Sequence, residues 1–233
     1  MMSAIHRMIA ILAITFACQI VVAADYRVEI TNLTHKIDFT PRIVIAHVPV
    51  SFFAAGDNLN DTAGGLLDGQ INSALTEIAE AGNLDPMITV LNQESVQNFV
   101  SYVVGADLLA VGKKQTVELL NVDERLSHIS LFAMLLPTND GFIALNNAAL
   151  PQTTANTMRY YLNAYDAGTE TNTESCADIP GPLCSGTAQS PDDTGEGFVH
   201  IHRGVRGLHP EEINPAEYDW KNPVAVVTIS RIQ

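Results

Sequence analysis

The stretch LSHISLFAMLLPTNDGFIAL, residues 126–145, decides the fold. Its first part is a long apolar run that ends at Pro137, and GFIAL (141–145) forms a second apolar run. The four residues PTND between the two runs are typical of turns. The stretch therefore predicts two buried strands joined by a hairpin-like turn.

Most of the chain outward from this hairpin also has the patterns of strands. Residues 25–33 alternate between apolar and polar side chains, which predicts a half-buried strand. The predicted strands, besides the hairpin, are 25–33, 42–48, 114–122, 196–205 and 222–232, while 94–104 fits either a helix or a strand.

One segment has helical spacing instead. Its apolar residues recur at intervals of three and four, and Gly82 is placed to end the helix. The spaced residues are Ile71, Ala74, Leu75, Ile78 and Ala79. The fold class predicted is all-β, an antiparallel β-sandwich with one or two short helical insertions. We expect one domain over residues 25–233.

Composition limits the classes of partner. The chain has 233 residues, of which 47% are hydrophobic and 16% charged, so it can bury a substantial core. Its net charge is −14. Nucleic acid is not expected as a partner, because phosphate binding needs a basic surface. A cation or a basic partner is the natural complement of so acidic a chain.

The N-terminus has the features of an export signal. Arg7 precedes an apolar segment, and small residues stand before Asp25, so residues 1–24 are predicted to be a signal peptide. A lipoprotein signal with Cys18 as the anchor is the alternative. No other apolar run is long enough to span a bilayer. We expect a secreted or periplasmic protein without a membrane span.

Two cysteines follow the predicted signal peptide. Cys176 and Cys184 are separated by ADIPGPL, which contains turn-forming residues. An even number of cysteines in an exported chain suggests a disulfide, and two free thiols are the alternative.

Three acidic residues occupy turns next to apolar strands. They are Asp140 in PTNDGF and the pair Asp166 and Glu170 in YDAGTE, and no Lys or Arg is near that pair in sequence. Calcium binds carboxylates and turn carbonyls, so these turns could form a calcium site. Three solvated turn acids are the alternative.

Several motifs resemble one known family. SLFAMLLPTNDGFIAL, YDAGTE, EGFVHIH and YDWKNPVAVVTISR are similar to the spondin domain, the spondin N-terminal family found in F-spondin, mindin and short secreted bacterial proteins. The resemblance covers residues 25–232 and favours the bacterial single-domain branch. It implies a C2-like β-sandwich that binds one calcium ion through Asp140, Asp166 and Glu170. The family's animal members have Asp at the last position, where this chain has the longer Glu170.

Histidines suggest a different kind of site. His200 and His202 should share one face of a strand, and His47 ends another strand. Such an arrangement can bind copper or zinc, although histidines with a purely structural role are the alternative.

The chain lacks the familiar sequence signatures of an enzyme. It contains no GxSxG and no HExxH motif. We therefore expect a non-catalytic adhesion or binding module with calcium as its cofactor. Its partner would be an unidentified protein or glycan, extracellular or in the cell envelope. The alternative is a periplasmic copper- or zinc-binding protein, or a metalloenzyme, that uses His47, His200 and His202.

Overall fold

A computed structural model describes residues 23–61, 67, 69–189 and 195–233. The predicted signal peptide lies outside these residues except for Ala23 and Ala24, which begin the first strand. No helix in the described part of the chain is long and apolar enough to cross a membrane.

The smaller of two antiparallel sheets has the strand order β5-β1-β11-β8. Its strands are β1 (Ala23–Asn32), β5 (Lys114–Asp123), β8 (Thr157–Leu162) and β11 (Ala225–Arg231). The alternating pattern predicted for the first strand is confirmed, since every second residue of β1 is buried. These side chains face the other sheet and exclude water between the layers.

The larger sheet has the order β10-β9-β7-β6-β3-β4, and the short β2 pairs with β6. Its β6 and β7 form the predicted hairpin. The strands are β2 (Asp38–Phe39), β3 (Ile43–His47), β4 (Val100–Val104), β6 (His128–Leu136), β7 (Gly141–Ala149), β9 (Ala164–Asp166) and β10 (His200–Ile201).

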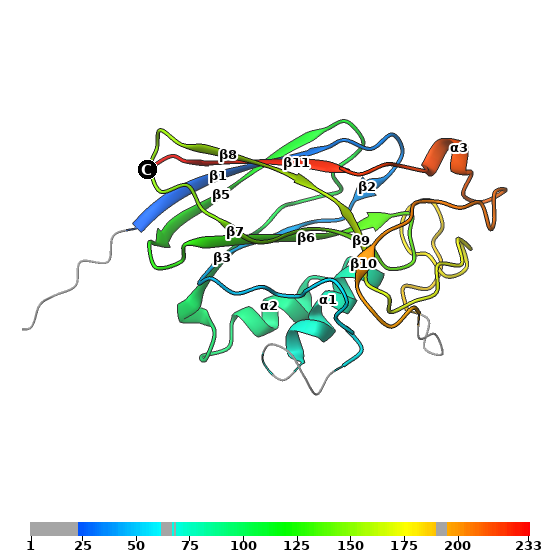
Figure 1. Ribbon diagram of the computed structural model, residues 1–233, viewed down its shortest axis with the longest axis horizontal. Coiled ribbons are helices and arrows are strands. Elements are labelled where there is room, and N and C mark those ends of the chain that lie inside the picture. Colours follow the sequence, from blue (N-terminus) through cyan, green and yellow to red (C-terminus); the bar gives the residue numbers. More distant parts are fainter. Residues whose placement is uncertain (1–22, 62–66, 68, 190–194) are drawn as a thin grey trace, which may run out of the picture.

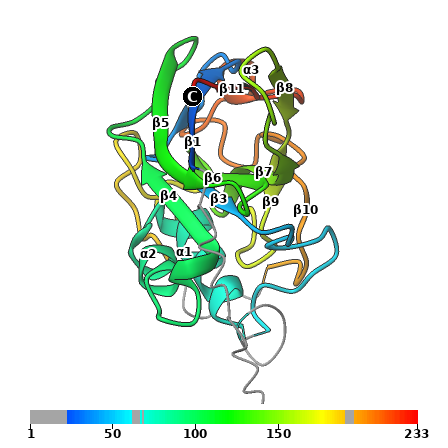
Figure 2. The same cartoon turned by 90° about the vertical axis from the view of Figure 1, so that its left-hand side faces the viewer.

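Two helices cover the outer face of the larger sheet, as Figures 1 and 2 show. They are α1 (Gln70–Ala81) and α2 (Asp85–Leu91); the shorter elements are η1 (Gln97–Phe99) and α3 (Pro215–Tyr218). Gly82 ends α1 as predicted, with φ 62°, and its N–H donates to the Ile78 carbonyl at 3.0 Å.

The three layers enclose two cores, which explains why β3 and β6 are apolar on both faces. Val44 and Ala46 pack between the sheets, whereas Ile43 and Ile45 pack under the helices. The all-β sandwich is therefore confirmed, with the helices added to one side.

Two predicted segments differ from the structure. Residues 94–104 divide into η1 and β4, so the segment contains both of the structures considered. The strand predicted at 196–205 shortens to the two residues of β10. The glycines around β10 explain this, because left-handed backbone interrupts an extended strand; they are Gly195, Gly197, Gly204 and Gly207, all with positive φ.

Candidate metal centre

Neighbouring strands bring the predicted acidic residues to one end of the larger sheet. Asp166 at the end of β9 is paired with Gly141 of β7 on one side and with His200 of β10 on the other. Asp140 immediately precedes Gly141 in the turn from β6 to β7. Residues paired in register point to the same face of a sheet, so Asp166 and His200 share a face.

Asp140, in the first acidic turn, is completely buried. The second acidic turn, which carries Asp166 and Glu170, surrounds its carboxylate. Its Oδ2 accepts hydrogen bonds from the Thr169 N–H at 2.8 Å, the Thr169 hydroxyl at 3.3 Å and the Glu170 N–H at 3.1 Å. Its Oδ1 is also buried but has no hydrogen-bond partner among the described residues. Oδ2 thus orders the turn, and Oδ1 makes no hydrogen bond to the described residues.

Asp166 and Glu170 are each only 1% exposed. Asp166 Oδ1 accepts from the Gly168 N–H at 2.9 Å, and Oδ2 accepts from Asn172 Nδ2 at 2.7 Å. Gly168 has φ 68°, and a Cβ there would lie 2.3 Å from the Phe198 carbonyl oxygen. The tight turn that places both acids therefore depends on glycine.

The electrostatics of this end of the sheet favour a cation. Burial, followed by the negative charges of Asp166 and Glu170, raises the pKa of Asp140 well above its usual value. Burial also raises the pKa of Asp166, which Asn172 and His200 partly oppose. In the described part of the chain, no Lys or Arg forms an ion pair with Asp140 or Asp166. Among the described residues, His200 is the basic side chain that pairs with Asp166, with its Nδ1 3.6 Å from Oδ1.

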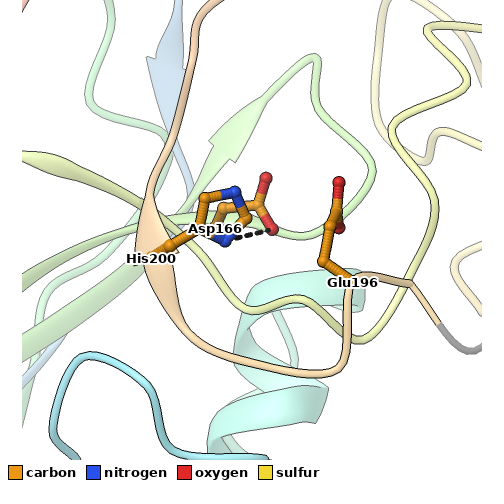
Figure 3. A group of neighbouring side chains, drawn as sticks. All are labelled: Asp166, Glu196 and His200. Carbon is orange, nitrogen blue, oxygen red and sulfur yellow. Dashed lines mark ion pairs between the residues drawn. The ribbon is translucent and has the colours of Figure 1, made fainter.

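A second group of possible metal ligands includes Glu196, which the sequence did not indicate. Among the described residues, Asp166, Glu196 and His200 bring three ligand atoms within 4.8 Å of one another (Figure 3). The predicted trio of Asp140, Asp166 and Glu170 does not form a group of this kind there. Glu196 lies in a glycine-rich loop far from Asp166 in sequence, so only the folded chain shows that the two are close.

The structure does not bring His47 to the other two histidines. It lies in β3, and three strands separate β3 from β10. At the usual strand spacing this is roughly 19 Å. Both His47 nitrogens are used locally, with Nε2 2.8 Å from the Ser130 hydroxyl and Nδ1 2.6 Å from the Val48 carbonyl oxygen. The proposed site of three histidines is therefore not present.

His202 is also held by its surroundings. Its side chain is buried against Trp220, with ring centroids 4.8 Å apart, and its Nδ1 accepts the Gly204 N–H at 3.0 Å. Burial, with a smaller contribution from His200, lowers the pKa of His202 to about 3. The ring is therefore neutral at ordinary pH and packs as part of the core.

The predicted disulfide between Cys176 and Cys184 is confirmed. It closes part of the long loop that follows the acidic turn. The start of this loop is tied to the first acidic turn, because Asn139 Nδ2 donates to the Thr173 hydroxyl at 3.2 Å and Asn139 Oδ1 accepts the Glu174 N–H at 3.3 Å. The disulfide thus lies in a loop that is fastened to the site.

The fold and this site define a class of protein: an antiparallel β-sandwich with buried acidic turns at one end of a sheet. The family model described as Spondin_N matches residues 67–181, which include α1, the β6–β7 hairpin and both acidic turns. The chain therefore contains a spondin N-terminal domain, as its motifs suggested. No curated protein matches the chain.

Proposed function

We propose that this protein is a secreted or periplasmic calcium-binding module of the spondin type. Asp140, Asp166 and Glu170 would supply the carboxylates that hold the ion. The observation that carries the proposal is the buried Oδ1 of Asp140, which has no hydrogen-bond partner among the described residues and stands near two further acids. Calcium favours such oxygen ligands and would neutralise their charge.

The role of the ion would be to fix two turns together. Asp140 lies between β6 and β7, and the other two acids follow β9, so one cation would brace both turns at the same end of the sheet. A rigid end can present loops to a protein or glycan partner with little loss of conformational entropy on binding. We infer a non-catalytic adhesion or binding function, in keeping with the generally non-enzymatic character of this domain family.

Export is the second part of the proposal. A disulfide in the folded domain fits an oxidising compartment. A metal-handling function that needs His47 together with His200 and His202 is not favoured, because β3 and β10 are separated by three strands.

Thermal unfolding tests calcium binding. The purified protein is melted in chelator and again with added calcium. A ligand at 100 times its dissociation constant stabilises a protein by about 2.7 kcal/mol, which corresponds to a rise of about 5–10 °C for a domain of this size. Asp166→Ala should abolish the rise.

The matched control is Asp57→Ala. Asp57 is an exposed turn residue whose carboxylate accepts the Ala54 N–H at 2.7 Å, and this variant should keep the full response. An unchanged melting temperature in the wild-type protein at saturating calcium would reject the proposal.

A further inference from the structure

We propose a second cation site beside the calcium position, formed by Asp166, Glu196 and His200 and suited to a zinc-type divalent ion. It shares Asp166 with the proposed calcium site but adds a nitrogen ligand and a third chain segment. The three side chains come from β9, from the loop before β10 and from β10 itself, and they converge in Figure 3.

The distances suit a small ion. Ligand atoms about 2.0–2.1 Å from a tetrahedral zinc lie roughly 3.4 Å from one another. His200 Nδ1 and Asp166 Oδ1 are 3.6 Å apart, and all three ligand atoms lie within 4.8 Å. Side-chain rotations that move the ligand atoms by about an ångström would therefore bring Glu196 to the same ion.

His200 and Asp166 lie at ion-pair distance, as the dashed line in Figure 3 marks, but their contact is not a hydrogen bond. The separation of 3.6 Å is longer than a hydrogen bond. His200 Nδ1 is closer to the Phe198 carbonyl oxygen, at 3.2 Å, and Nε2 is buried without a partner among the described residues. The imidazole is therefore positioned by the Phe198 carbonyl oxygen and lies beside the Asp166 carboxylate.

The number of negative charges also favours a second bound cation. Four carboxylates belong to the two neighbouring sites, and those of Asp140 and Asp166 are almost completely buried. One imidazolium could offset a single negative charge at most. Two divalent cations would neutralise all four carboxylates; the acids are Asp140, Asp166, Glu170 and Glu196.

The backbone holds Glu196 in place. The Gly197 N–H donates to the Gly168 carbonyl oxygen at 2.8 Å, which fastens the loop to the acidic turn. Asn172 Nδ2 donates to Asp166 at 2.7 Å and reaches Glu196 Oε1 at 3.5 Å, so one amide spans both carboxylates. The ligands are thus brought together before any ion binds.

The donor set selects the ion. One imidazole and two carboxylates suit zinc, which accepts nitrogen and oxygen ligands and often leaves a position for water. Calcium takes oxygen ligands and more of them, so His200 contributes nothing to its binding. The two sites should therefore differ in which ion they prefer.

Calorimetric titration of Zn²⁺ into the purified protein, with calcium present in excess, tests the second site. We expect one strong zinc site per chain. His200→Ala should weaken it by at least about 100-fold, because even the loss of an outer hydrogen-bond partner of a metal ligand costs 10–100-fold. Glu196→Gln should also weaken zinc binding, and it changes only an exposed side chain, so its effect cannot be attributed to misfolding.

Two further variants serve as controls for the zinc titration. His209→Ala removes an exposed histidine that is paired with Glu211 at 3.3 Å, and zinc binding should be unchanged. Asp140→Asn should lose calcium and keep zinc, so the two sites can fail separately. Absence of a zinc site, or equal zinc affinity in the wild type and His200→Ala, would overturn the second site and leave the calcium proposal to its own test.

Discussion

Replacing Asp140 by asparagine should stabilise the protein in the absence of metal. The side chain is completely buried, and only one of its oxygens has hydrogen-bond partners among the described residues. The asparagine side chain would keep a carbonyl oxygen for the N–H groups of Thr169 and Glu170, which now lie 2.8 and 3.1 Å from Oδ2. Its amide nitrogen would place a donor where Oδ1 now lies, and the substitution removes a negative charge near Asp166.

The size of the effect follows from the removal of the charge. Both side chains keep a buried polar atom at the position of Oδ1, but an unpaired buried atom costs more than about 1–3 kcal/mol when it is charged. We therefore expect Asp140→Asn to stabilise the metal-free protein by about 2 kcal/mol near neutral pH. For a domain of this length, that raises the melting temperature by about 4–8 °C.

The effect should depend on pH in one direction. The pKa of Asp140 is raised in the folded protein, mainly by burial, so the folded state binds this proton more tightly than the unfolded state does. The wild type therefore loses stability as the pH rises through the folded pKa, and the asparagine variant does not. The advantage of the variant should be small at about pH 4 and larger at about pH 8.

The assay is a set of melts in chelator at several pH values, repeated with calcium. Asp57→Asn is the control, since it makes the same substitution at an exposed turn carboxylate instead of a buried one. With calcium, the wild type should overtake Asp140→Asn, because the variant has lost an ionised ligand. If the variant is less stable than the wild type in chelator at every pH, the argument from buried charge is refuted.

Three further outcomes are expected from melts of single variants. Gly168→Ala should lower stability by more than Gly112→Ala, since both glycines have positive φ but a Cβ meets the neighbouring backbone only at Gly168; equal losses would show that the contact is unimportant. Replacing Cys176 and Cys184 by alanine should cost about 2–3 kcal/mol, the chain-entropy value for so short a loop, and an unchanged melt would contradict this. His202 should make the protein less stable as the pH falls from about 6.5 to about 3, because only the unfolded state accepts its proton there; His202→Gln should show a weaker decline, and an identical pH profile would refute it.

The sequence predicted those elements whose signals are local. The alternation of residues 25–33 and the helical spacing before Gly82 depend on near neighbours in the chain, and both segments fold as expected. The hairpin at 126–145 carries its own turn residues, and it also formed. The apolar character of β3 on both faces is explained by helices that cover the outer side of the sheet.

The parts that the sequence did not predict depend on contacts between distant segments. Glu196 reaches Asp166 only because a loop is fastened to the acidic turn through Gly168. The strand expected at 196–205 was interrupted by left-handed glycines. The sequence pattern could not show that His47 lies far from His200, because the order of strands in a sheet is set by the whole fold.

Calcium binding at the acidic turns is the central claim, and calorimetric titration with calcium in two buffers of different ionisation enthalpy tests it most directly. The account predicts one tight ion per chain, with release of a proton that grows as the pH falls toward the raised pKa of Asp140. Asp166→Ala should give no binding. Calcium binding of equal strength in the wild type and Asp166→Ala, or no binding in either, would contradict the account.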